Sequence, residues 1–166
     1  MSKIVNNPVI DDPQITAIRN AIEHRATWFY LLFDEIRKSG GDAEAVGRAA
    51  VYRCGAFHGL EKMFKNCADT KDLREFVKVF ADETGLKLFE MEVLENSRDK
   101  LSLDFHYCPL VTAWKKLGAS DEEIALLCDI AMEGDRGIIS QFDGYKFELG
   151  QTIAAGDPVC EIRISK

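Results

Sequence analysis

The feature that most constrains this chain is a change of hydrophobic period within residues 101–117. Up to residue 107, apolar and polar side chains alternate, which predicts a half-buried strand. From Pro109 onward, apolar residues recur at intervals of three and four, which predicts a helix with proline in its first turn. A strand that passes directly into a helix places Cys108 at the helix N-cap. The helix dipole and the unpaired backbone N–H groups there favour the thiolate over the thiol.

The strict alternation puts Asp104, His106 and Cys108 on one face of this strand. Cysteine–histidine chemistry needs an imidazole within reach of the sulfur and a third group that orients the ring. We therefore predict Cys108 as nucleophile, His106 as general base and acid, and Asp104 as the orienting group. Glu90 and Glu92 of the preceding strand are alternatives for the third role, because cross-strand neighbours share a face. A simpler interpretation makes this face solvated surface and Cys108 a small buried hydrophobe.

Cys54 and His58 form a second pair, four residues apart on a predicted helix. This spacing can place two ligands on one metal ion, and His106 and Cys108 would complete a four-ligand site. A buried cysteine and a hydrogen-bonded histidine are the simpler interpretation. No cofactor is predicted, and no cysteine pair has the CxxC spacing of a structural zinc site.

Three further residues are candidates for substrate binding. Arg136 lies in a turn bracketed by glycines and is suited to clamp a carboxylate, although a solvent-exposed arginine is an equal alternative. Arg25 lies within an apolar helical stretch, where a charge requires a buried partner or a ligand. His58 is placed to line a pocket beside Gly55 and Gly59, whose spacing of one turn predicts close approach of another backbone or a ligand.

The order of predicted elements indicates one α+β domain over residues 1–166, with N-terminal helices followed by a four-stranded, mainly antiparallel sheet interrupted by helices. After a disordered start, helices are predicted over about 13–39, 43–66 and 70–85, and then a hairpin near 89–107. Two helices, a turn region at 134–137 and a second hairpin near 145–165 complete the chain.

Composition narrows the classes of partner. The net charge of -7, from 21 basic and 28 acidic residues, excludes a basic stripe for nucleic acid. No apolar run is long enough to span a bilayer, and the N-terminus lacks the apolar core of an export signal. Five widely spaced cysteines fit free thiols in a reducing compartment. We expect a cytoplasmic protein with a small-molecule substrate, and a homo-oligomer is left open.

Several segments resemble the L-2-amino-thiazoline-4-carboxylic acid hydrolase-like family. They include residues 25–28, 53–55, 58–59, 105–114, 117–118 and 127–129, and an ending made up of residues 147–148, 152–154, 156–157 and 160–163. The resemblance implies a hydrolase that opens an aminothiazoline ring, or a similar small cyclic C–N bond, to give a carbamoyl-cysteine. The Gly-Asp-Pro-x-Cys-Glu hairpin is also similar to vinyl-reductase-type domains, which implies the alternative of a non-catalytic sensor of a small ligand or a metal.

Overall fold

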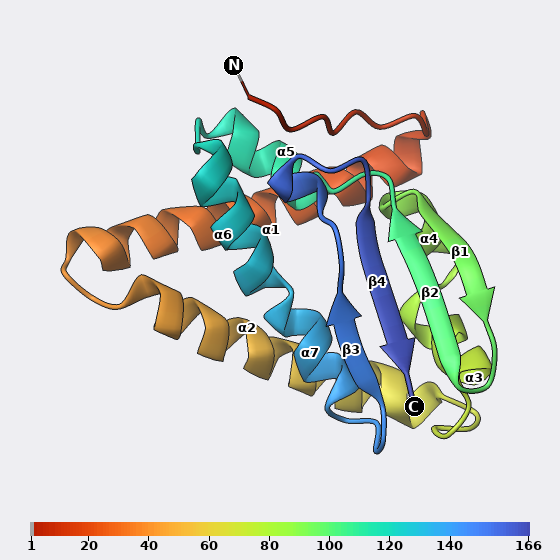
Figure 1. Cartoon of the computed structure of the whole chain (residues 1–166). Helices are drawn as coiled ribbons and strands as arrows, with labels where there is room; N and C mark the ends of the chain where they lie inside the picture. The colour runs from red at the N-terminus through yellow and green to blue at the C-terminus, as the bar shows by residue number, and fades with distance from the viewer. Residues whose placement is uncertain (1) are drawn as a thin grey trace.

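The computed structural model describes residues 2–166 and places helices before and between the strands of a single sheet (Figure 1). The helices are α1 (Pro13–Lys38), α2 (Ala43–His58), α3 (Leu73–Phe80), α4 (Glu83–Leu88), α5 (Pro109–Lys116), α6 (Asp121–Ala131) and α7 (Glu133–Ile139). The strands are β1 (Met91–Asn96), β2 (Lys100–Phe105), β3 (Lys146–Leu149) and β4 (Cys160–Ser165). Short helical turns are η1 (Gly59–Met63), η2 (Phe64–Asn66) and η3 (Ile153–Ala155).

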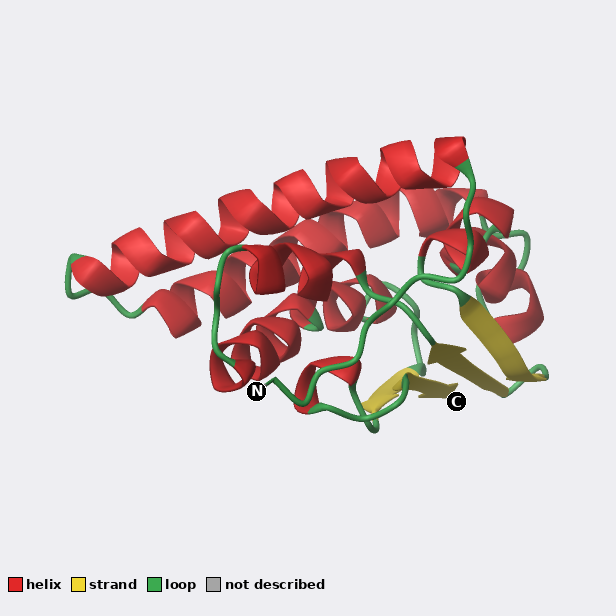
Figure 2. Ribbon diagram, turned by 90° about the horizontal axis from the view of Figure 1, so that it is seen from above, coloured by secondary structure: helices red, strands yellow, loops and turns green. Residues whose placement is uncertain are grey.

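The four strands form one antiparallel sheet in the order β1-β2-β4-β3. The helices gather on one side of it (Figure 2), so the sheet has a packed face and an open face. Leu103 of β2 lies opposite Ile162 of β4, and both are buried, as the alternation requires. The predicted α+β arrangement is confirmed.

The core lies between the packed face of the sheet and the helices. Trp114 of α5 is almost fully buried, and its indole N–H donates to the carbonyl of Ala26 in α1 at 3.2 Å. This bond satisfies the one polar group of a large apolar side chain and fixes α5 against α1.

Glycines allow α2 and α7 to touch backbone to backbone. A Cβ on Gly55 would lie 2.0 Å from the carbonyl oxygen of Gly134, and one on Gly137 would lie 2.2 Å from the carbonyl oxygen of Tyr52. A Cβ on Gly59 would lie 2.8 Å from Cα of Ile138. The predicted close approach at Gly55 and Gly59 is therefore confirmed. The segment predicted as a turn region is instead helix α7, because its glycines serve this contact.

Two other expectations differ from the structure. The third predicted helix is divided into α3 and α4, and α3 starts after Asp72, whose carboxylate accepts from the backbone N–H of Arg74 at 3.0 Å. Residues 2–11, predicted to be disordered, form an ordered N-terminal strap that runs past α5 to the start of α1 (Figure 1). Its backbone N–H groups at Val9 and Ile10 both donate to the Glu90 carboxylate at 2.8 Å.

Among the described helices, none combines the length and the apolar character that crossing a membrane requires.

Candidate functional site

Cys108 is the N-cap of α5, as predicted, but its side chain is buried. The strand β2 ends at Phe105, so the alternation of faces stops before the cysteine is reached. The chain bends at His106, and both Tyr107 and Cys108 then turn toward the interior. The expectation that Cys108 shares a face with His106 is wrong because the period of two does not continue through the bend.

The N-terminal strap holds the backbone of Cys108 in place. The Asn6 side chain accepts from the Cys108 N–H at 2.9 Å and donates to the Cys108 carbonyl at 2.8 Å. The same amide nitrogen donates to the Thr112 hydroxyl at 2.9 Å. Asn6 therefore joins the strap to the start of α5 through the backbone of Cys108 and the Thr112 hydroxyl.

Burial raises the pKa of the Cys108 thiol above its ordinary value. The backbone N–H groups of Val111 and Leu110 and the positive charge of Arg25 act in the opposite direction, while Asp135 adds to the increase. The N-cap position thus has the predicted effect on the thiol, but desolvation outweighs it. The prediction of an ionised sulfur does not hold in this conformation.

His106 lies on the exposed side of the strand–helix junction, where its Nε2 is 3.2 Å from Oε2 of Glu92. Asp104 accepts from the guanidinium of Arg163 at 2.8 Å. Within residues 2–166 no hydrogen bond joins His106 to either Asp104 or Cys108, so the three predicted catalytic side chains are not assembled here.

Glu90 does not share the open face with Glu92. Its backbone adopts a positive φ of 51°, which turns the side chain inward, and the carboxylate forms a buried ion pair with Arg19 at 3.0 Å. Glu90 thereby serves the N-terminal strap rather than His106.

The two candidate arginines differ in their surroundings. Arg136 donates to Glu133 at 2.9 Å and contacts Asp129 at 3.4 Å, in a charged network on α6 and α7. Arg25 is exposed on α1 and, among the described residues, has no ion-pair partner. The expectation of a buried partner for Arg25 is therefore wrong, because this face of α1 is open.

The Cys54–His58 pair shows a similar difference. Cys54 is exposed, against the expectation of burial, whereas Nδ1 of His58 is buried and has no hydrogen-bond partner in the part of the chain that is described. Over residues 2–166, no three His, Cys, Asp or Glu side chains are grouped to hold a metal ion. Cys54, His58, His106 and Cys108 thus do not come together as ligands in this structure.

An acidic group that the sequence pattern did not indicate lies near the buried thiols. Asp135 on α7 is half-buried, and desolvation raises the pKa of its carboxyl to about 7 although Arg136 acts to lower it. Its charge contributes to the raised pKa values of Cys108 and Cys128, after the larger effect of burial on each thiol. Cys128 and Cys160 are buried, as expected. The sequence signal for Asp135 is its position next to Arg136 between Gly134 and Gly137.

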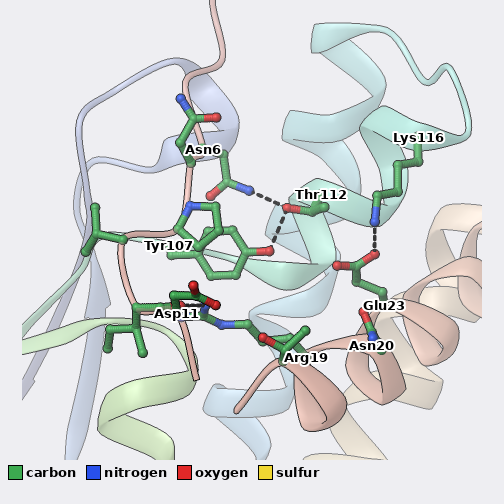
Figure 3. Close-up of a pocket in the computed structure, with 13 residues that line it drawn as sticks. Asn6, Asp11, Arg19, Asn20, Glu23, Tyr107, Thr112 and Lys116 are labelled. Carbon is green, nitrogen blue, oxygen red and sulfur yellow. Dashed lines mark hydrogen bonds and ion pairs between the residues drawn. The ribbon is translucent and has the colours of Figure 1, made fainter. Parts of the chain in front are cut away.

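A cavity of about 500 Å³ lies between the N-terminal strap, α1 and α5 (Figure 3). Neither Cys108 nor His106 lines it. Its wall includes acidic, basic and hydroxyl groups, among them Asp11, Arg19, Glu23, Tyr107, Thr112 and Lys116.

The charged groups of this cavity have different roles. The Arg19 guanidinium stacks over the Tyr107 ring at 4.4 Å and donates to the backbone carbonyls of Ile10 and Leu88, so it is fully occupied in holding the wall. Lys116 and Glu23 form a pair at 2.5 Å at the side of the cavity (Figure 3). A ligand that carries both a negative and a positive group can replace this pair, with its negative group on Lys116 and its positive group on Glu23.

Tyr107 is the hydroxyl best placed for chemistry in the cavity. A chain of hydrogen bonds runs from Asn6 to the Thr112 hydroxyl and from Thr112 to Oη of Tyr107 at 3.0 Å (Figure 3). Because Thr112 donates to it, Tyr107 keeps its own proton for another acceptor. Burial raises the pKa of Tyr107, which keeps the phenol protonated at neutral pH.

Comparison with solved structures places this α+β architecture among known folds. A crystal structure of a trafficking protein particle complex subunit 3 from Naegleria fowleri, covalently bound to palmitic acid, superposes with a TM-score of 0.59 at 16% sequence identity. The match covers 86% of this chain and 93% of that chain, and at this identity the likeness concerns the fold alone. The sequence of residues 19–164 matches the family described as L-2-amino-thiazoline-4-carboxylic acid hydrolase, and the chain belongs to this family. No curated protein matches it in sequence.

Proposed function

We propose that this protein is a hydrolase that opens a small heterocycle carrying a carboxylate and an amidine-like carbon, such as an aminothiazoline carboxylate. The family supports a hydrolytic reaction. The observation that carries the proposal is the cavity beside Tyr107, where acidic, basic and proton-donating groups surround a volume of about 500 Å³. A cavity of this size accommodates a small molecule.

In this proposal the cavity binds the substrate through its two charged ends. The Lys116 ammonium pairs with the carboxylate of the substrate, and the Glu23 carboxylate, released from Lys116, accepts from the amidine N–H groups. Both side chains are held by helices, so the substrate is oriented between α1 and α5.

Ring opening requires attack at the carbon bonded to both nitrogen and sulfur. Water adds to this carbon while one of its protons passes to the ring nitrogen; the tetrahedral centre then collapses to a carbonyl, the ring C–S bond breaks, and the remaining hydroxyl proton replaces the one that Tyr107 gives to the sulfur. The departing ring atom takes a proton, and the product carries a carbamoyl group. The free proton of Tyr107 serves as the donor to the departing atom.

Cys108 and His106 are the alternative catalytic pair within the same reaction. Cys108 does not line the cavity and its side chain is packed in the buried core, so attack by its sulfur requires a rearrangement of the strand–helix junction. His106 would have to leave Glu92.

The test is incubation of the full chain with L-2-amino-thiazoline-4-carboxylic acid and detection of carbamoyl-cysteine by mass spectrometry. We expect Tyr107→Phe to lower kcat by about 100-fold, within the range for loss of a general acid. Lys116→Ala should raise KM by about tenfold, since one lost charge contact is worth about 1.4 kcal/mol. Lys100→Ala, at an exposed lysine on β2, is the matched control and should leave both constants unchanged.

The outcomes separate the candidate sites. Loss of turnover in Cys108→Ser and His106→Ala, with full activity in Tyr107→Phe, would assign catalysis to the cysteine and histidine. If the unmodified chain gives no product, the hydrolase proposal with this substrate is rejected.

A non-catalytic binding protein is the second candidate. It is favoured by the fold, because the trafficking subunit of the same fold is a structure with a covalently bound fatty acid. A ligand-dependent rise in melting temperature without turnover would support this alternative.

A further inference from the structure

The outer face of α1 and α2 is open to solvent and carries mainly apolar side chains, with a few charged residues among them. On α1, exposed positions recur at intervals of three and four through Ile18, Ala21, Arg25, Trp28, Leu32 and Glu35. On α2 and the two following turns, the same spacing runs through Val46, Ala50, Arg53, Phe57, Leu60 and Phe64. This is the heptad spacing by which one helix packs against another. We call these two stripes together the outer face.

The two stripes lie on the same side of the helix pair. Phe29 of α1 contacts Gly47 of α2, which fixes the sides on which the two helices meet. Viewed along each helix from its own N-terminus, the exposed stripe lies on the same rotational side of the position that meets the other helix. The core-facing residues lie on the opposite side of that position. The pair therefore presents one apolar surface, on the side of α1 and α2 that faces away from the sheet (Figure 2).

The exposed area of the outer face is large for a monomer. Trp28 is 63% exposed, Leu32 57% and Phe57 62%. With about 150 Å² for an aliphatic side chain and roughly 200–250 Å² for an aromatic one, the large apolar residues of both stripes expose about 640 Å². The largest patch on a typical monomer is roughly 300–600 Å². A standard protein interface takes about 800 Å² from each partner, which this face nearly supplies.

The charges on the α1 stripe indicate which partner fits. If two copies of α1 cross antiparallel at the level of residue 30, Trp28 of one copy faces Leu32 of the other, and Arg25 faces Glu35. Arg25 has no ion-pair partner within the described chain, and Glu35 contacts only the exposed Lys38 at 2.9 Å. The stripe is thus complementary to itself in both apolar contacts and charge.

We propose that the outer face is the interface of a two-fold homodimer, centred on antiparallel α1 helices and flanked by the α2 stripes. This proposal does not depend on the function proposed above. It accounts for an unpaired arginine and a tryptophan that both lie in solvent in the single chain.

Analytical ultracentrifugation of the full chain at micromolar concentration tests the proposal. We expect twice the mass of one chain for the unmodified protein and the single-chain mass for Leu32→Glu. Leu94→Glu is the matched control, because Leu94 is 51% exposed on the edge strand β1, outside the outer face. This variant should stay dimeric. Circular dichroism checks that each variant is folded.

A charge exchange tests the antiparallel register. Arg25→Glu and Glu35→Arg alone should each weaken dimerisation by at least tenfold, and the double variant should recover it. A monomeric unmodified protein, including one that binds lipid vesicles through this face, would overturn the proposal. So would an open-ended oligomer, a dimer that survives Leu32→Glu, or a double variant no better than the single ones.

Discussion

Replacing Gly55 by alanine tests the backbone contact that sets α7 against α2 and places Asp135 beside the buried thiols. The new Cβ would lie 2.0 Å from the carbonyl oxygen of Gly134 and 2.7 Å from its carbonyl carbon. The obstructing atoms are backbone of a helix, not the end of a flexible side chain, so the two helices must separate. Separation opens the contact along its whole length, including the position where Gly137 meets Tyr52.

The expected loss of stability follows from two opposing effects. Overpacking of this kind costs about 1–3 kcal/mol. Because the new Cβ meets helix backbone, which cannot move aside as a flexible side chain can, we expect a cost near the upper end of this range. Alanine gains about 1 kcal/mol over glycine within a helix. The net loss in the free energy of unfolding is about 2 kcal/mol, which for a chain of this size lowers the melting temperature by roughly 4–8 °C.

The measurement is thermal and urea unfolding followed by circular dichroism. Gly134→Ala is the control from the other side of the same contact, because its Cβ would meet only the Val51 side chain, at 3.6 Å. Its melting temperature should equal or exceed that of the unmodified protein. Equal melting temperatures for Gly55→Ala and Gly134→Ala would refute the argument that close backbone approach selects glycine at position 55.

Three further predictions concern the surroundings of the candidate site. Glu90→Ala leaves the Arg19 charge buried and unpaired, and we expect urea unfolding to show a loss of about 3–5 kcal/mol. The Asp135 carboxyl has an ordinary pKa of 3.8, which rises to about 7 in the folded chain, so the unfolded chain releases this proton first. Stability from this group therefore falls as pH rises from about 4 to 7 and is level above that range. Asp135→Asn should lack this fall in melting-temperature profiles, and an unchanged profile would contradict the raised pKa of Asp135. Asn6→Ala removes the hydrogen bonds that join the strap to Cys108, so thiol labelling mapped by mass spectrometry should become faster at Cys108. Labelling of the exposed Cys54 should stay the same. Equal labelling of Cys108 in both proteins would show that the strap does not shield it.

Local signals in the sequence were sufficient for most of the fold. The Asp12–Pro13 start of α1 and the capping box at Ser120 each depend on contacts within a few residues, and both are present in the structure. The α7 helix was missed because its glycines look like turn residues until the opposing helix is known.

The candidate site was less accessible to prediction. The N-cap position of Cys108 depends on Pro109 alone and was found, but the direction of the thiol depends on a bend at His106 that ends the alternation. The cavity depends on contacts between distant segments, such as Asn6 with Cys108, and no periodic pattern encodes these contacts. Nor does alternation show that Glu90 adopts a positive φ and turns inward.

The N-terminal strap has a consequence for how the chain folds during synthesis. Asn6 and Cys108 are 102 positions apart, so the strap has no partner during synthesis until the start of α5 has been made. At roughly 5–20 residues per second, translation leaves this segment waiting for several seconds or longer. Its docking is thus a late event that closes a loop of about a hundred residues.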